Sequence, residues 1–182
     1  MTDLLNEETL GYKLEEIILV VALRIEYLLQ ADKATIFVVD KERQQIWSKN
    51  ARGVNEELIQ ITIPLNAGIV GHVATTGEFV NIPDAYADPR FNQQIDKETG
   101  YRTHSILCMP LINSKNEVFA VVQLLNKQTH NAFTTEDEEI FIALISSLNK
   151  TLEASILLIH HAENKMSGTR LQSVETTWDT VK

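Results

Sequence analysis

Residues 105–125 run SILCMPLINSKNEVFAVVQLL, and the organisation of the whole chain can be worked out from this segment in both directions. Residues 105–112 and 118–125 are apolar runs of strand length, rich in residue types that favour strands. The four residues between them, NSKN, have a composition typical of a turn. The pattern predicts two neighbouring antiparallel strands joined by a short connection.

Four further strands are predicted on the N-terminal side of this hairpin. Residues 34–40 (ATIFVVD) have the composition of a central strand, and residues 45–49 are expected to return antiparallel to it. Residues 59–63 alternate strictly between apolar and polar side chains, which indicates a half-buried strand that Pro64 ends. Residues 79–82 form a brief fourth strand.

A short helix and a long polar connection flank the last of these strands. Residues 68–77 (GIVGHVATTG) predict a short helix bracketed by glycines. Residues 83–100 are polar and include Pro89 and Gly100. A connection of this length in a compact domain is usually functional or disordered. Together with the short helix it is expected to leave a pocket over one face of the sheet.

Long helices are predicted at both ends of the chain, because apolar side chains recur there every three or four residues. The first stripe comprises Leu14, Ile17, Ile18, Val21, Ile25 and Leu28. Near the C-terminus, Thr135 and Glu138 have the spacing of a capping box that begins a helix. The second stripe comprises Phe141, Leu144, Ile145, Leu148, Leu152, Ile156 and Ile159. It is longer than one small domain can bury.

This order of elements predicts an α+β fold with a central antiparallel sheet of about six strands. The long N- and C-terminal helices cover one face, and the short helices and a ligand-capping loop lie on the other. The expected divisions are an N-terminal helix over residues 1–31, the sheet and pocket over 32–133, a C-terminal signalling helix over 134–165, and a tail or linker over 166–182.

Charge and composition exclude several classes of partner. The chain has 182 residues, 44% of them hydrophobic, and a formal net charge of −9. Its 16 basic residues are scattered, whereas nucleic-acid binding requires a clustered basic surface. The acidic balance also argues against docking on anionic membranes. We therefore expect neither nucleic acid nor membrane as a partner.

The cellular context is predicted from the single cysteine and from the N-terminus. Cys108 alone excludes an internal disulfide framework and a cysteine zinc cluster. The acidic N-terminus is unlike a signal peptide, and the longest apolar runs are too short to span a bilayer. A cytoplasmic location is expected.

Several ordered blocks of the sequence resemble GAF domains. They include residues 34–40, 68–77, 81–91 (NIPDAYADPRF), 106–111 and 121–127. More narrowly, the chain is similar to the GAF domains of cyclic-nucleotide phosphodiesterases and cyanobacterial adenylyl cyclases, which carry Asn-Lys, a gap, and Phe-x-x-x-Asp-Glu. The matching residues here are Asn126, Lys127, Phe133, Asp137 and Glu138.

The resemblance implies a ligand site on named residues. A cyclic phosphate would meet backbone N–H groups near Ile69 and Val70, because a helix N-terminus favours an anion. The capping segment would contribute Asp96, Thr99 and Thr103. The strands would contribute Thr35 and Gln123 to the pocket floor. No cofactor or metal is required, and cAMP is the bound ligand that the resemblance implies.

Cyclic AMP is preferred over cyclic GMP as the expected ligand. Cyclic-GMP-binding relatives are expected to carry an Asp after the second strand, whereas residues 49–53 are KNARG. Asn50 or Arg52 cannot accept from the guanine N1–H and amino group as a carboxylate does. Two alternatives remain: a ligand-free dimerisation module, and a sensor of another small ligand such as a bilin. Cys108 precedes Met109-Pro110 in an apolar strand, which indicates a buried, inert thiol.

The resemblance also implies a regulatory role without catalysis. The sequence lacks Gly-x-Ser-x-Gly, His-Glu-x-x-His and a phosphate-loop Gly-Lys-Ser/Thr. We expect an input domain of a larger signalling enzyme, which forms a homodimer through its terminal helices. Lys127 and Asp137 are expected to form a structural ion pair. His72 is expected to be a packed or hydrogen-bonding residue, and adjacent His160 and His161 face different ways.

Overall fold

Six antiparallel strands form one sheet in the computed structural model, which describes residues 7–52, 57–129 and 132–175. The strands are β1 (Ala31–Asp40), β2 (Gln45–Arg52), β3 (Leu58–Pro64), β4 (Val80–Ile82), β5 (Ile106–Ile112) and β6 (Val118–Lys127). Their order across the sheet is β3-β2-β1-β6-β5-β4, and every neighbouring pair is antiparallel. The predicted α+β class and central antiparallel sheet are confirmed.

Alternation along the central strands divides the core into two clusters, one on each face of the sheet. In β1, Ile36 and Val38 pack on one face, whereas Phe37 and Val39 pack on the other. The register between β1 and β6 places Thr35 directly opposite Gln123. Both sides of the sheet are therefore covered, and the two faces hold different elements.

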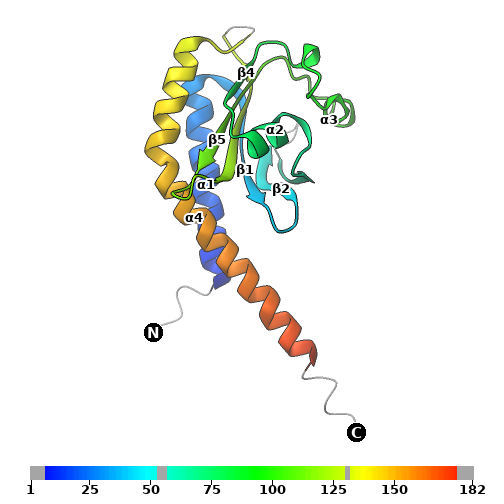
Figure 1. Ribbon diagram of the computed structural model, residues 1–182, viewed down its shortest axis with the longest axis vertical. Coiled ribbons are helices and arrows are strands. Elements are labelled where there is room, and N and C mark those ends of the chain that lie inside the picture. The colour runs from blue at the N-terminus through cyan, green and yellow to red at the C-terminus, as the bar shows by residue number, and fades with distance from the viewer. Residues whose placement is uncertain (1–6, 53–56, 130–131, 176–182) are drawn as a thin grey trace.

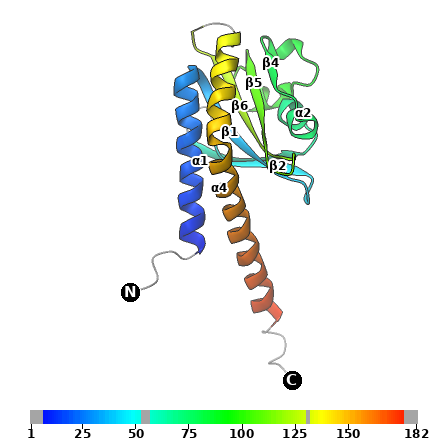
Figure 2. The ribbon, with the colours of Figure 1, turned by 60° about the vertical axis from the view of Figure 1, so that its left-hand side comes forward.

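The helices α1 (Glu7–Leu29) and α4 (Thr135–Glu175) lie side by side and antiparallel across one face, as predicted (Figures 1 and 2). The buried face of α1 comprises Ile18, Ala22, Ile25 and Leu29. The predicted stripe was wrong for Ile17 and Leu28, which are 43% and 40% exposed. The buried stripe therefore runs through Ala22 and Leu29 instead. The side chain of Leu14 lies outside the described residues.

The start of α4 is one residue away from the predicted cap. Thr134 Oγ1 accepts from the Asp137 N–H at 3.2 Å, and the Thr134 N–H donates to Asp137 Oδ2 at 2.8 Å. The predicted Thr135–Glu138 box was therefore wrong, because the capping box is formed by Thr134 and Asp137. Glu138 instead accepts from Asn81 Nδ2.

The C-terminal helix is longer than predicted. It continues to Glu175, so residues 166–175 are helix rather than tail, while 176–182 lie outside the described residues. No proline follows Pro110, and the single Gly168 costs only about 1 kcal/mol relative to alanine in a helix. Figure 1 shows this part of α4 projecting well beyond the sheet.

One described helix is long and apolar enough to cross a membrane by length and composition alone. This is the segment Thr135–Leu158 of α4, whereas the sequence analysis considered only continuous apolar runs. Helices that pack against the core of soluble domains meet the same criterion. In this chain Phe141, Ile145, Leu152 and Ile156 of the segment are buried in the core cluster beneath α1 and α4.

The opposite face of the sheet carries α2 (Gly68–Thr76), the 3-10 turn η1 (Ala85–Ala87) and α3 (Gln93–Thr99). The polar connection over residues 83–100 thus contains two short helical segments. Gly77 ends α2 with a φ of 72°, in the left-handed region that glycine tolerates best. This arrangement places the start of α2 and the whole of α3 above the central strands (Figure 1).

Candidate ligand-binding site

A cavity of about 160 Å³ lies between the sheet, the first turn of α2 and the helix α3. Six of the seven residues expected from the resemblance line it: Thr35, Ile69, Val70, Asp96, Thr103 and Gln123. The seventh, Thr99, is the last residue of α3, and its side chain lies outside the described residues. The cavity is therefore the place where the predicted site residues come together.

The floor of the cavity combines one polar pair with apolar walls. Thr35 and Gln123 are opposite each other in the β1–β6 ladder, and both are half-buried. Each offers a donor and an acceptor to a bound molecule. Apolar side chains surround the pair: Phe37, Ile59, Ile61, Ile63, Phe91, Ile95 and Leu125. Such a surface suits a flat, partly apolar ligand with a few polar atoms.

The first turn of α2 opens into the cavity. Gly68, Ile69 and Val70 all line it, and the residue before the helix is Ala67. Among the described residues no side chain caps this helix start. The first N–H groups of a helix have no partner within the helix, and the helix dipole makes this end electropositive. The geometry can therefore accept an anionic group.

A close backbone approach holds this turn in place. A Cβ on Gly71 would lie 2.6 Å from the Asn66 carbonyl carbon and 2.8 Å from the Leu65 oxygen. Only a glycine permits the helix to sit this near to the connection from β3. Gly71 therefore sets the position of the α2 start over the cavity.

Asp96 fastens α3 to the strand that follows it. Its carboxylate accepts from the Thr103 N–H at 2.7 Å, from Thr103 Oγ1 at 2.8 Å and from the Tyr86 hydroxyl at 3.2 Å. Asp96 and Thr103 are both buried. Asp96 and Thr103, both predicted to contact the ligand, thus line the cavity. They also hold its wall closed through the hydrogen bonds between them.

The sequence analysis left several lining residues unassigned, among them Lys33, Arg52 and Tyr101. Lys33 Nζ donates to the Arg52 carbonyl at 3.0 Å and lies 4.7 Å from the centre of the Tyr101 ring. The Tyr101 hydroxyl donates to the Asp32 carboxylate. Burial, together with that hydrogen bond, raises the pKa of Tyr101 above its usual range. Lys33 precedes the strand predicted over residues 34–40, so no sequence pattern marked it as a lining residue.

Lys127 and Asp137 lie outside the cavity. Lys127 Nζ donates to Asp137 Oδ1 at 2.7 Å and to the Leu29 carbonyl at 2.9 Å. The pair thereby joins the end of β6 to the start of α4 and to the end of α1. The side-chain oxygen of Asn126, the residue before Lys127, accepts hydrogen bonds from the backbone N–H groups of His104 and Ser105. These contacts are structural.

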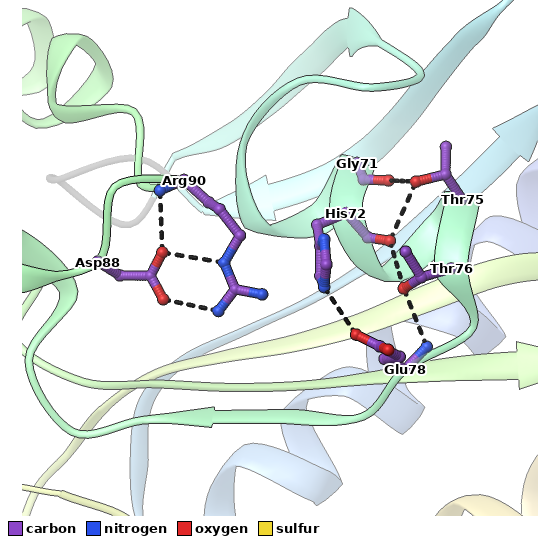
Figure 3. A network of polar contacts seen from close by, with 7 residues as sticks. All are labelled: Gly71, His72, Thr75, Thr76, Glu78, Asp88 and Arg90. Atoms are coloured by element: carbon purple, nitrogen blue, oxygen red, sulfur yellow. Dashed lines mark hydrogen bonds and ion pairs between the residues drawn. The ribbon is translucent and has the colours of Figure 1, made fainter.

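The outer face of α2 carries a separate set of polar contacts, shown in Figure 3. His72 Nε2 lies 3.0 Å from Glu78 Oε2, and Arg90 pairs with Asp88 at 2.7 Å. The hydrogen bonds from Arg90 hold the pKa of Asp88 below its usual value. His72 does not line the cavity. Its imidazole lies within hydrogen-bond distance of Glu78 instead.

The other reactive side chains are accounted for where the structure describes them. Cys108 is fully buried, and burial raises the pKa of its thiol, which matches the inert thiol predicted from the sequence. The side chains of His160 and His161 lie outside the described residues. Within the described part of the chain, no cluster of three or more His, Cys, Asp or Glu side chains could hold a metal ion.

Comparison with known proteins identifies a matching family and several relatives. The family model of the GAF domain matches residues 13–152. A stretch of 80 residues is 51% identical to the dual 3',5'-cyclic-AMP and -GMP phosphodiesterase 11A of Takifugu rubripes. That stretch is 44% of this chain but only 9% of the phosphodiesterase.

Solved structures agree on the fold. The GAF domain of a phosphoenolpyruvate-protein phosphotransferase (ptsP) from Coxiella burnetii superposes with a TM-score of 0.65 at 22% identity, covering 89% of this chain and 97% of that one. The corresponding domain from Acinetobacter gives a TM-score of 0.64 at 20% identity, covering 83% and 86%. At these identities the likeness concerns the fold alone.

Proposed function

The chain belongs to the GAF domain family of sensory and regulatory modules, and we propose that it binds a cyclic nucleotide, cAMP in preference to cGMP. The ligand occupies the cavity beneath α3, and the terminal helices of a homodimer relay its presence to an output domain. The role is regulatory rather than catalytic. The pufferfish relative is named for both cyclic nucleotides, which supports this ligand class.

The observation that carries the proposal is the electropositive character of an otherwise apolar cavity. The start of α2, without a side-chain cap among the described residues, opens into it. The charged side chains on its wall are the cations Lys33 and Arg52 and the carboxylate Asp96. Arg52 is ion-paired with Glu26 and Asp96 offsets Lys33, so the positive character of the cavity comes from the uncapped start of α2. Such a site favours a small anion with an apolar body.

The preference for adenine follows from the acceptors available. Guanine requires an acceptor for its N1–H and amino group, and Asp96 is the one carboxylate among the described lining residues. Its oxygens already accept hydrogen bonds from Thr103 and Tyr86. The adenine amino group needs a single acceptor, which the side-chain oxygen of Gln123 or Thr35 can supply.

Ligand entry requires a change in the cavity wall. Sites for small molecules typically have volumes of roughly 300–1,000 Å³, whereas this cavity measures about 160 Å³. We infer that α3 moves outward to admit the nucleotide. A ligand that binds the wider form more tightly shifts the population toward it, and this shift is the signal.

The direct test is the melting temperature of the purified, nucleotide-free chain with saturating cAMP and, separately, cGMP. A ligand at about 100 times its Kd adds roughly 2.7 kcal/mol, which corresponds to about 5–11 °C for a domain of this size. A shift with cAMP larger than that with cGMP is expected. A larger shift with cGMP would overturn the base preference, and no shift with either would overturn cyclic-nucleotide binding.

If neither cyclic nucleotide binds, two other functions remain. A visible absorption band in the protein as isolated would indicate a bilin-type ligand. A dimer that responds to no ligand would indicate a dimerisation module, for which the exposed apolar face of α1 provides the specific observation. That face comprises Ile17, Val20, Leu23, Tyr27 and Leu28.

A further inference from the structure

The described ladder pairs between the central strand β1 and its neighbour β2 lie near the turn that connects them. They join residues 38–40 to residues 45–47. Toward the start of β1 and the end of β2, side chains bridge the strands instead: Lys33 Nζ donates to the Arg52 carbonyl at 3.0 Å, and Arg52 donates to the Asp32 carbonyl at 3.3 Å. At this end, where Lys33 and Arg52 line the cavity, the described contacts between β1 and β2 run through side chains, and we refer to this end of the two strands as the opening between them.

Glu26 of helix α1 reaches into this opening. Its carboxylate accepts from the backbone N–H of Ala34 in β1 at 3.0 Å. The same oxygen receives the guanidinium of Arg52 in an ion pair. The two side chains are only 15% and 16% exposed. A partly buried pair of this kind is expensive to break, because a lone charge would remain poorly solvated.

Arg52 thus has contacts on both sides of the sheet. Its side chain lines the cavity, on the face covered by α2 and α3, while its partner Glu26 belongs to a helix on the other face. A second contact leads to the same place: the Tyr101 hydroxyl, from the segment after α3, donates to the carboxylate of Asp32. The cavity wall, the capping segment and the end of α1 therefore meet around Asp32.

We propose that the Glu26–Arg52 ion pair, passing through the opening between β1 and β2, couples occupancy of the cavity to helix α1. This inference rests on the proposed function for the identity of the ligand. A ligand acceptor that draws Arg52 into the cavity competes with Glu26 for the guanidinium. The carboxylate then loses the guanidinium while it keeps the Ala34 N–H, and the hold of α1 on the sheet weakens. Ligand binding and α1 release are linked reciprocally through this pair.

The first arm of the test needs no ligand. Amide hydrogen exchange of α1 is measured in the full chain for the wild type, for Arg52→Met and for the control Arg43→Met. Arg43 is also paired with a carboxylate, that of Asp40, but it lies in the turn between β1 and β2 with its own side chain 62% exposed. Arg52→Met is expected to accelerate exchange around residue 26 by at least about fivefold, the lower end of usual coupling energies, and the control to leave it unchanged. Equal exchange in Arg52→Met and wild type would overturn the coupling.

The second arm adds cAMP or cGMP and compares Glu26→Gln with wild type and with the control Glu117→Gln, which alters an exposed pair with Lys41. Calorimetry reports binding, and exchange reports α1. Wild type and Glu117→Gln are expected to show a change in α1 exchange on saturation, whereas Glu26→Gln binds without that change. Should Glu26→Gln fail to fold, Glu26→Asp, which keeps the charge but shortens the reach, serves in its place.

The two proposals fail in different ways. Binding without any α1 response in the wild type, or a full response in Glu26→Gln, would overturn the coupling and leave the ligand assignment standing. Absence of binding by either nucleotide would overturn the ligand assignment, and the ligand-free comparison of Arg52→Met with Arg43→Met would then decide the coupling.

Discussion

Lys127 at the end of β6 and Asp137 in the first turn of α4 form an ion pair of 2.7 Å, with side chains only 7% and 9% exposed. Because Lys127 also donates to the Leu29 carbonyl, three elements depend on one ammonium group. We predict that Lys127→Met lowers the free energy of unfolding by about 3–5 kcal/mol, since it leaves a buried carboxylate without its counter-charge. Urea unfolding measures this. Lys41→Met, which breaks an exposed pair, is expected to cost less than about 1 kcal/mol.

The same pair predicts a pH dependence of stability. Desolvation raises the pKa of Asp137, but the hydrogen bonds from Lys127 and Thr134 outweigh it, so the net pKa is lowered. A carboxyl whose pKa is lower in the folded state contributes stability that is complete above its unfolded pKa of about 3.9. That contribution is lost as the pH falls through the folded value. Wild type should therefore lose more stability than Asp137→Asn between about pH 5 and pH 2; equal slopes would contradict the assignment.

Asp96 is predicted to control the movement of α3. Asp96→Ala removes the acceptor of Thr103 and Tyr86 and leaves the buried Thr103 N–H without its partner, at a cost of about 1–3 kcal/mol. The capping segment should open more often, so limited proteolysis within residues 91–103 should accelerate. Asp88→Asn changes a carboxylate in the same connection that bonds only to Arg90 in the described contacts, and it is the matched control. Unchanged cleavage in Asp96→Ala would show that α3 is held by other contacts.

The arrangement of strands and helices could be predicted from the sequence because it depends on periodicity, which is a local property. The hairpin of residues 105–125, the alternation of residues 59–63 and the two terminal helices all appear where expected. The cap of α4 could not be placed to the residue. Thr134 and Thr135 both precede an acid at the required spacing, and only the geometry shows that Asp137, rather than Glu138, bonds back to the cap.

The cavity could be predicted in part. Thr35, Gln123 and the start of α2 were found because the motifs around them resemble a known family. Arg52 and Tyr101 were missed as lining residues, because their place in the wall depends on the opening between β1 and β2 and on the segment after α3. Neither feature leaves a periodic signal in the sequence. Such tertiary contacts become visible only in the structure.

The polar floor of the cavity is predicted to contribute to affinity and not to stability. Thr35→Val keeps the shape of the side chain but removes its hydroxyl, and Gln123→Leu removes the amide. Loss of one hydrogen bond to the ligand, worth about 0.5–1.5 kcal/mol, should weaken nucleotide binding up to roughly tenfold in each variant. Calorimetry measures the affinity, and the melting temperature without ligand is the control. Equal affinity in both variants and wild type would place the ligand elsewhere.

Gly71→Ala is predicted to destabilise the domain although alanine is the better helix former. The gain in helix propensity is about 1 kcal/mol. The new Cβ would lie 2.6 Å from the Asn66 carbonyl carbon, so the backbone must shift at a cost of about 1–3 kcal/mol or more. The start of α2 would move with it, and nucleotide affinity should fall as well. Thr75→Ala, at an exposed position of the same helix, should alter neither property by a comparable amount.

The exposed face of α1 is predicted to hold the proposed homodimer together. Val20 and Tyr27 are 64% and 74% exposed, and they lie on the same face as Ile17 and Leu28, so the face presents contiguous apolar surface that a second copy can bury. In a symmetric dimer each substitution is present twice, so Val20→Glu places two carboxylates in the interface and should raise the dissociation constant by at least about a hundredfold. Sedimentation velocity over a concentration series measures this. Thr62→Glu, on the exposed side of β3, should leave the association unchanged; a dimer equally stable in Val20→Glu would move the interface away from α1.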